Sequence, residues 1–296
     1  MPERINKAIE LLLQGQPVYT LHQPGGAELG YDRGRALAKT WADAIFVDME
    51  HGAFNVSALE AFMQGLLESG PTASGHRMPA VIAQVPVEGS SEAVIRANSW
   101  QFRQVLATGV HGVLLCHAEN PEAVRAFVES CRMPFHPVGV GARLGEGRRG
   151  SGGQAAAAQV WGLGQQDYLQ RAEPWPLNPS GELLLGIKVE NRRALERAED
   201  STRVPGLAFA EWGPGDMGFS FGLPDAHDPP YPPTMEAARE RIRAATKAAR
   251  IHFLNMVSPE DVVAQLGAGV MICAPGPRSA EAARIGRAHT RRQMPV

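Results

Sequence analysis

The sequence has few cysteines and no long apolar run. Its three cysteines, Cys116, Cys131 and Cys273, are scattered, odd in number and never in CxxC spacing. A disulfide framework and a thiolate zinc site are therefore unsupported. No stretch approaches the ~20 apolar residues that cross a bilayer, and the segment Met1–Leu13 lacks the apolar core of a signal peptide. These absences predict a cytoplasmic protein without a membrane partner.

The chain also lacks an excess of either charge and a convincing nucleotide-binding loop. It carries 29 basic against 31 acidic residues, a net charge of -2, so it shows no electrostatic footprint for nucleic acid. The glycine-rich stretch 139–153 has no GK[ST] tripeptide and is not a Walker loop. Residues 213–218 match GxGxxG, but the strand before them comes late in the chain. We interpret these glycines as a turn whose N–H groups can approach a bound carboxylate.

What the sequence does contain is a regular alternation of apolar, β-branched runs with amphipathic stretches. The runs predict strands at Pro17–His22, Ala44–Glu50, Pro79–Val85, Gly112–His117, Leu183–Glu190, Gly206–Trp212, Ile251–Val257 and Val270–Ala274. Helices are predicted between them, at Val56–Glu68, Ser91–Ala107, Pro121–Cys131, Met235–Arg250, Pro259–Leu266 (with Ser258 as N-cap) and, last, Ser279–Arg292. This count favours an α/β fold, a single (β/α)8 barrel over residues 1–296. A doubly wound sheet fits the alternation too, but usually has fewer strands and a phosphate loop after the first.

Residues 135–181 interrupt this rhythm. The segment is rich in Gly, Ala and Gln and ends in Pro174-Trp175-Pro176. Because it follows the fourth strand, we expect it at the rim where barrels carry function, as a lid-like or interface insertion. The alternative is that the segment is an irregular insertion without a functional role.

Reactive side chains gather where the predicted strands end: Asp48, Glu50, His51, His117, Glu190 and Asp216. Desolvated carboxylates repel one another, so bringing several together is costly unless a cation neutralises them. Oxygen ligands with few imidazoles and no thiolates suit Mg²⁺ or Mn²⁺. We therefore predict Glu190 and Asp216 as metal ligands. The alternative for each is a rim carboxylate paired with an arginine.

His51 is the candidate general base. Its ordinary pKa lies near working pH, and Asp48, three residues earlier, is available to orient it. The alternative is that His51 has a structural role only, as a helix cap or as a partner in a hydrogen bond.

Together these motifs resemble the HpcH/HpaI family of class II pyruvate aldolases, which also includes lyases of the citrate lyase β type. The resemblance is carried by Phe46 to His51, Val189-Glu190, Asp167-Tyr168-Leu169 and Gly213 to Asp216, and spans roughly residues 5–280. It implies a (β/α)8 barrel, typically a hexamer in which the C-terminal helix packs on a neighbouring subunit. Family members cleave or form a carbon–carbon bond next to a 2-keto acid, through a pyruvate enolate held on a divalent metal.

Carried over by position, the resemblance implies a role for each motif. Glu190 and Asp216 match the metal carboxylates, and the backbone around Gly215 matches the segment that holds the pyruvate carboxylate. His51 matches the catalytic base and Asp48 its neighbouring acid. The metal is expected to be Mg²⁺ or Mn²⁺, with Co²⁺ and Zn²⁺ as further candidates.

Four positions depart from the family pattern. Around Ala107, the aspartate that supports the histidine in the family is replaced. Gln84 stands where the family has an arginine that stabilises enolate charge, and Lys188 stands where it commonly has glutamine. A neutral amide can hydrogen-bond an oxyanion but adds no charge. Lys188 is expected to point into the barrel like Glu190, where it would neutralise the carboxylates, supply the missing charge or form a Schiff base. His117 is expected to reach the substrate or the metal.

The sequence thus predicts a metal-dependent lyase that cleaves a 4-hydroxy-2-keto acid to pyruvate and an aldehyde. The predicted catalytic residues are His51, Asp48, Gln84 and Lys188, and the predicted substrate-binding residues are Gly215, Gln84 and His117. Two alternatives stay open: a lyase or decarboxylase of the same barrel that forms a different enolate, and a non-catalytic homologue that binds a keto acid.

Overall fold

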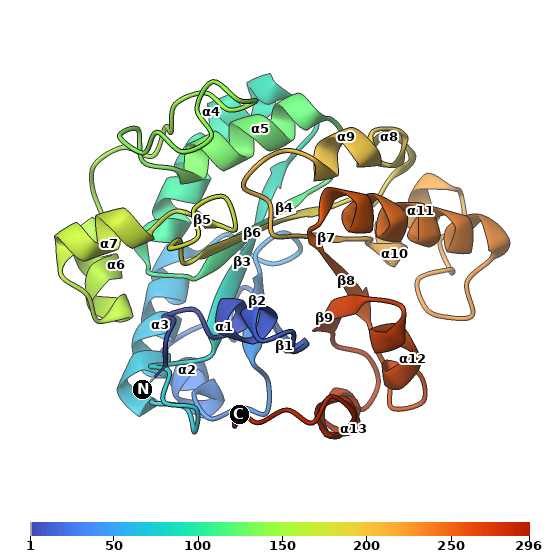
Figure 1. Ribbon diagram of the computed structural model, residues 1–296, viewed down its shortest axis with the longest axis horizontal. Coiled ribbons are helices and arrows are strands. Elements are labelled where there is room, and N and C mark those ends of the chain that lie inside the picture. Colours follow the sequence, from blue (N-terminus) through green and yellow to red (C-terminus); the bar gives the residue numbers. More distant parts are fainter. Residues whose placement is uncertain (1) are drawn as a thin grey trace.

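The computed structural model describes residues 2–296, and a closed barrel of parallel strands forms its centre (Figure 1). Eight strands form the ring, in which β9 pairs with β1 and β4 pairs with β6. In order they are β1 (Val18–Pro24), β2 (Ala44–Asp48), β3 (Ala80–Glu88), β4 (Gly112–Cys116), β6 (Leu183–Lys188), β7 (Phe209–Glu211), β8 (His252–Met256) and β9 (Val270–Ala274). The predicted (β/α)8 barrel is confirmed, and each predicted strand overlaps one of these eight. A ninth, two-residue strand, β5 (Pro174–Trp175), pairs with the start of β6.

Helices surround the barrel, and side-chain caps fix where several of them begin. The helices are α1 (Lys7–Leu13), α2 (Tyr31–Leu37), α3 (Val56–Ser69), α4 (Glu92–Ala107), α5 (Pro121–Cys131), α6 (Gln154–Trp161), α7 (Gln165–Arg171), α8 (Arg192–Glu196), α9 (Ala198–Thr202), α10 (Pro214–Ser220), α11 (Pro233–Ala249), α12 (Val262–Gly267) and α13 (Ser279–His289). Asn120 caps α5 by accepting the N–H of Ala123, and proline follows at the first helical position. None of the helices formed by residues 2–296 combines the length and the apolar character that a bilayer crossing requires.

One predicted helix start is wrong. We expected Ser258 to cap a helix from Pro259, but α12 begins at Val262. The carboxylate of Asp261 accepts hydrogen bonds from both the N–H and the hydroxyl of Ser258. The serine is thereby used as a donor within a turn, and the helix starts one turn later.

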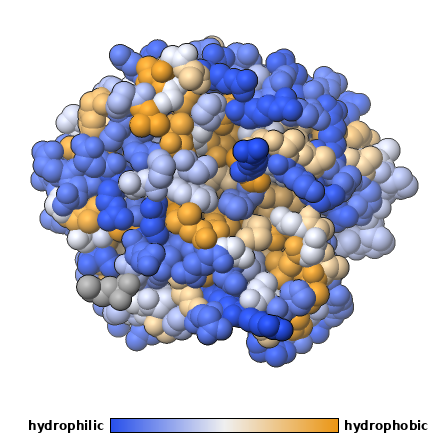
Figure 2. All heavy atoms as spheres, in the orientation of Figure 1, coloured by the Kyte–Doolittle hydropathy of each residue, from blue (hydrophilic) through white to orange (hydrophobic). Residues whose placement is uncertain are grey.

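The barrel interior is filled by side chains that alternate along the strands. Phe46 and Ile82 point inward, and Phe209 packs edge-on against Phe46. Gly186 leaves room for the Phe209 ring, since a Cβ there would lie 2.2 Å from it. Apolar residues of α1 join this cluster, so α1 closes the N-terminal end of the barrel, as Figure 1 shows. Figure 2 shows the surface of the molecule from the same side as Figure 1. This surface is mostly hydrophilic, and its apolar side chains lie in separate patches.

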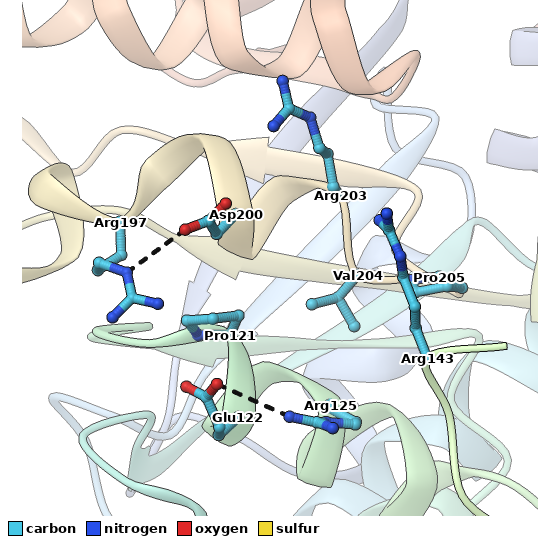
Figure 3. A pocket seen from close by; sticks show the side chains of 9 residues that line it. All are labelled: Pro121, Glu122, Arg125, Arg143, Arg197, Asp200, Arg203, Val204 and Pro205. Atoms are coloured by element: carbon cyan, nitrogen blue, oxygen red, sulfur yellow. Dashed lines mark ion pairs between the residues drawn. The ribbon is translucent and has the colours of Figure 1, made fainter. Parts of the chain in front are cut away.

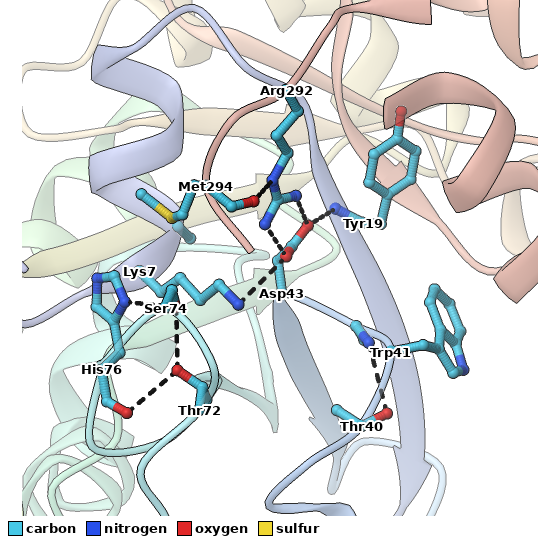
Figure 4. Close-up of polar contacts among 12 residues, drawn as sticks. Lys7, Tyr19, Thr40, Trp41, Asp43, Thr72, Ser74, His76, Arg292 and Met294 are labelled. Carbon is cyan, nitrogen blue, oxygen red and sulfur yellow. Dashed lines mark hydrogen bonds and ion pairs between the residues drawn. The ribbon is translucent and has the colours of Figure 1, made fainter. Parts of the chain in front are cut away.

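A buried carboxylate ties both chain ends to this closed end of the barrel (Figure 4). Asp43, fully buried, accepts two hydrogen bonds of 2.7 Å from Arg292 and one of 3.2 Å from Arg287. The N–H of Tyr19 donates a further bond of 3.1 Å, and Lys7 Nζ lies 3.5 Å away. Helix α13 packs on its own barrel here, and its expected contact with a neighbouring subunit stays a prediction.

Two tryptophans of the segment 135–181 lie away from the rim where we expected the segment. The indole N–H of Trp161 donates to Gly109 just before β4, and Trp175 stacks on His252 at the start of β8. These contacts lie at the N-terminal ends of the strands, because α5 first returns the chain to that end. The lid-like or interface role of the whole segment stays a prediction.

Candidate active site

Side chains from several strands meet at the opposite, C-terminal end of the barrel. Asp48 ends β2 and lies beside Gln84 of β3 in the strand register. Lys188 ends β6 and lies beside Glu211 of β7. Since parallel strands all end at the same rim, residues distant in the sequence converge there.

Asp48 and His51 form a hydrogen-bonded pair. The loop after β2 turns so that the N–H groups of Glu50 and His51 donate to Asp48 Oδ1, at 2.9 and 3.0 Å. Oδ2 lies 2.9 Å from His51 Nδ1 and 3.1 Å from His22 Nε2. The imidazole of His51 remains largely exposed, so its second nitrogen faces outward from the pair. A substrate proton is therefore accessible to it.

The pair shifts the pKa of both partners. Burial alone would raise the pKa of Asp48, but hydrogen bonds from His22 and His51 hold it well below its usual range. Burial would lower the pKa of His51, but the bond to Asp48 and the charges of Asp48 and Glu50 raise it above 6.5. The aspartate thus stays ionised and strengthens the histidine as a base.

Three carboxylates and one imidazole form a second cluster. Glu50, His117, Glu190 and Asp216 each offer one ligand atom, and these atoms all lie within 4.8 Å of one another. The set is mainly oxygen with one nitrogen, which suits a hard divalent cation. The four groups could therefore hold the metal predicted from the sequence. Glu190 and Asp216 were predicted as its ligands and His117 as a residue that reaches the substrate or the metal, whereas Glu50 was given no such role.

Backbone features bring Glu190 into this cluster. Its Oε1 accepts the N–H of His117 at 2.8 Å, and His117 itself has a φ of 46°, in the left-handed region that histidine tolerates better than most residues. Gly213 passes so close that a Cβ there would lie 2.4 Å from Glu190 Oε2. The charged partner of that buried oxygen is the Lys188 ammonium, 2.8 Å away. A buried carboxylate is costly unless a cation balances it, and this ammonium does so in part.

Lys188 lies between two of the carboxylates. Its Nζ is 2.8 Å from Glu190 Oε2 and 3.0 Å from Glu50 Oε2. Burial would lower its pKa, but Glu190, Glu211 and Glu50 raise it well above 10.5. A Schiff-base lysine needs a neutral amine, and this environment favours the ammonium instead. One ammonium against Glu50, Glu190 and Asp216 still leaves the cluster negative.

The pKa values of the carboxylates in the cluster, and of Glu211 beside it, shift in different directions. Burial raises the pKa of Glu190, and the nearby charge of Lys188 only partly offsets this. Burial also raises the pKa of Glu211 to about 7. The pKa of Glu50 is lowered: burial opposes this, but Lys188 and hydrogen bonds from Cys116, Lys188 and Gln84 outweigh it. Glu50 is therefore held as the anion.

The remaining predicted residues lie around this cluster. The Gln84 amide donates to Glu50 Oε2, the oxygen that Lys188 also contacts. Gly215 lies in the first turn of α10, and open space surrounds the position of its missing Cβ. His117 Nε2 is 3.5 Å from Glu50, so His117 belongs to the cluster.

Sequence reasoning named Glu50 at the rim without giving it a role, and missed His22 and Glu211 altogether. Both missed residues fall at or near the ends of predicted strands, Pro17–His22 and Gly206–Trp212. That position is the signal that could have found them, since Asp48 and Lys188 also lie at strand ends and belong to the site.

Comparison with known proteins agrees with this architecture. Two crystal structures of HpcH/HpaI proteins share the fold: one from Burkholderia cenocepacia J2315 (TM-score 0.68, 22% identity, 93% of this chain and 94% of that chain) and one from Desulfitobacterium hafniense DCB-2 (TM-score 0.68, 16% identity, 97% of each chain). A 2-keto-3-deoxy-L-rhamnonate aldolase from Escherichia coli O9:H4 (strain HS) is 29% identical over 208 residues. That match covers 70% of this chain and 65% of the relative, so the chain spans slightly less than two thirds of the relative's length.

The family assignment rests on a longer match. The sequence profile of the family described as HpcH/HpaI aldolase/citrate lyase matches residues 35–271, which include all the site residues except His22. The chain therefore belongs to the HpcH/HpaI aldolase/citrate lyase family.

Proposed function

We propose that the protein is a divalent-metal-dependent aldolase that cleaves a 4-hydroxy-2-keto acid to pyruvate and an aldehyde. One observation carries the proposal: the ligand atoms of Glu50, His117, Glu190 and Asp216 converge within 4.8 Å beside the Asp48–His51 pair. This arrangement combines a cation site with a base at the mouth of the barrel. The name of the E. coli relative supports a 2-keto-3-deoxy sugar acid as the substrate class.

The cation, Mg²⁺ or Mn²⁺ in our proposal, supplies Lewis-acid stabilisation of charge on the keto acid. Glu190 and Asp216 would hold it, with Glu50 and His117 as further ligands. The open space above Gly215 admits the substrate carboxylate, which the neighbouring N–H groups can bind.

In the cleavage direction His51 removes the proton from the C4 hydroxyl of the substrate, on the carbon that becomes the aldehyde. Asp48 orients the imidazole through the Nδ1 contact, so Nε2 is the basic atom. As that proton leaves, the oxygen forms the carbonyl of the aldehyde, the C3–C4 bond breaks and its electron pair becomes the pyruvate enolate. The aldehyde leaves, and a proton added at C3 of the enolate gives pyruvate. Gln84 and Lys188 bind the developing oxyanion or the carboxylate, because both already converge as donors on one oxygen of Glu50.

Exchange of the pyruvate methyl protons in D₂O tests this function. Protein stripped with EDTA is expected to catalyse no exchange, and Mg²⁺, Mn²⁺ or Co²⁺ should restore it. His51→Gln should abolish aldol cleavage, whereas the matched His289→Gln, at an exposed position at the opposite end of the barrel, should not.

The outcomes separate the alternatives. Metal binding without any exchange would refute a pyruvate enolate and favour a different enolate or a keto-acid-binding protein. Trapping of pyruvate on Lys188 by borohydride would refute metal dependence. We also propose the hexamer that the resemblance implies, which sedimentation analysis can measure directly.

A further inference from the structure

A second pocket lies outside the barrel, between α5 and α9, and none of the candidate active-site residues lines it (Figure 3). Its volume is about 390 Å³, within the range of small-molecule sites. The side chains around it are Pro121, Glu122, Arg125, Arg143, Arg197, Asp200, Arg203, Val204 and Pro205. Four arginines against two acids leave the lining with a net charge of +2.

Two of these four arginines have an acidic partner in the lining, and the other two have none. Arg125 pairs with Glu122 at 3.8 Å and Arg197 with Asp200 at 3.5 Å, each within its own stretch of helix and exposed to water. Such exposed pairs are weak and exchange readily for a better anion. Arg143 and Arg203 form no ion pair and no side-chain hydrogen bond with any residue of the described chain 2–296 (Figure 3).

The chain holds Arg143 at the pocket in an unusual way. Its φ of 79° lies in the left-handed region, which costs a non-glycine residue energy. The turn around it is fixed by hydrogen bonds from Gly141 N–H to Leu144 and from Ala142 N–H to Gly139. Buried Leu144 anchors the end of that turn. The turn thus places Arg143 in the lining of the pocket (Figure 3).

The lining also has an apolar part. Pro121, Val204 and Pro205 contribute it, and Val204 is buried. A pocket of about 390 Å³ is larger than an inorganic anion needs. A ligand that matches both parts has a doubly charged head and an organic body. Guanidinium groups bind phosphate oxygens through paired N–H donors, which makes a phosphate ester the best fit.

We propose that this pocket, defined by Arg125, Arg143, Arg197 and Arg203, binds a small organic phosphate monoester at a site separate from the active site. The phosphate lies between Arg143 and Arg203, and the organic body lies against Pro121, Val204 and Pro205. Glu122 and Asp200 compete with the ligand for the other two arginines.

Isothermal titration of the full-length protein with glucose 6-phosphate at low ionic strength tests the proposal. We expect one site per chain, no binding of glucose, and weaker binding at higher salt. The double variant Arg143→Gln/Arg203→Gln should weaken binding at least about tenfold, because it removes two charge-assisted donors. Glu122→Gln should tighten binding, because it removes a competing carboxylate.

Two controls separate this site from others. Arg291→Gln removes the same charge from another exposed arginine with positive φ, and binding should not change. Glu190→Gln should also leave it unchanged, because Glu190 belongs to the active-site cluster. An equal loss in Arg291→Gln, or a loss in Glu190→Gln, would overturn the proposal.

The remaining outcomes also decide the matter. Citrate that binds more tightly than glucose 6-phosphate, with the same dependence on Arg143 and Arg203, would overturn the phosphate assignment. An oligomer that dissociates in the double variant during sedimentation would identify the face as a subunit interface and overturn the site. Absence of glucose 6-phosphate binding to the wild type would do the same.

Discussion

Replacing Lys7 by methionine is expected to stabilise the protein at pH 7. Lys7 is fully buried, and its Nζ donates no hydrogen bond. Asp43, 3.5 Å away, is already bound by Arg292 and Arg287. Burial lowers the pKa of Lys7 from 10.5 to about 8, with Asp43 opposing and the two arginines adding to the shift. The folded state therefore disfavours this ammonium.

The pKa difference gives the magnitude and the sign. The interval from 10.5 to about 8 corresponds to about 3 kcal/mol, since one pKa unit equals about 1.4 kcal/mol. Below pH 8 both folded and unfolded Lys7 are protonated, and the full cost applies. Between pH 8 and 10.5 the unfolded chain binds more protons than the folded one, so wild-type stability rises with pH. Methionine keeps the apolar stem and has no charge to bury.

Urea unfolding measured from pH 7 to 10.5 tests this reasoning. Lys7→Met should be more stable than wild type at pH 7 by up to about 3 kcal/mol, with the gap closing towards pH 10.5. The exposed Lys247→Met should change stability by less than about 0.5 kcal/mol. Asp43→Asn should have the opposite sign and cost about 3–5 kcal/mol, because it leaves buried cations without their carboxylate. A Lys7→Met protein that is less stable than wild type at pH 7 would refute the argument.

Three further predictions concern the active site. Glu190→Gln should weaken Mn²⁺ binding at least about 100-fold, because it removes a buried ligand; unchanged titration heats would contradict its role. Lys188→Met should bind Mn²⁺ more tightly and turn over more slowly, since the ammonium lies 2.8 Å from Glu190; weaker binding would show that it supports the cation. Because the pKa of His51 is raised, kcat/KM should fall as pH drops through a value above 6.5. Asp48→Asn should move that limb to lower pH, and an unmoved limb would exclude His51 as the titrating base.

The periodic pattern of the sequence was sufficient to predict the barrel. Runs such as Ala44–Glu50 are apolar throughout because a parallel strand is buried on both faces, and eight such runs leave few other folds. Helix starts were less predictable, as Ser258 shows, since Asp261 competes for the same hydrogen bonds. The position of 135–181 required the return of α5 to the N-terminal end, which the order of strands alone does not display.

Some residues of the candidate site could also be predicted from the sequence, and others could not. Asp48, His51, Glu190 and Asp216 could be predicted because charge at the end of a buried strand has few structural uses. The inclusion of Glu50 could not, because it depends on the turn after β2 and on distances across three other strands. Such distances arise only when the barrel closes.

The sequence by itself therefore determined the fold class, the rim at which the chemistry gathers and the residue types available there, because these follow from local periodicity and from the shared direction of parallel strands. Only the tertiary structure decided which groups meet. It placed Lys188 between Glu50 and Glu190 as an ammonium, placed Trp161 and Trp175 at the N-terminal ends of the strands, and gathered Arg125, Arg143, Arg197 and Arg203 around one pocket. Contacts between side chains on separate elements depend on packing and closure, which no local pattern records.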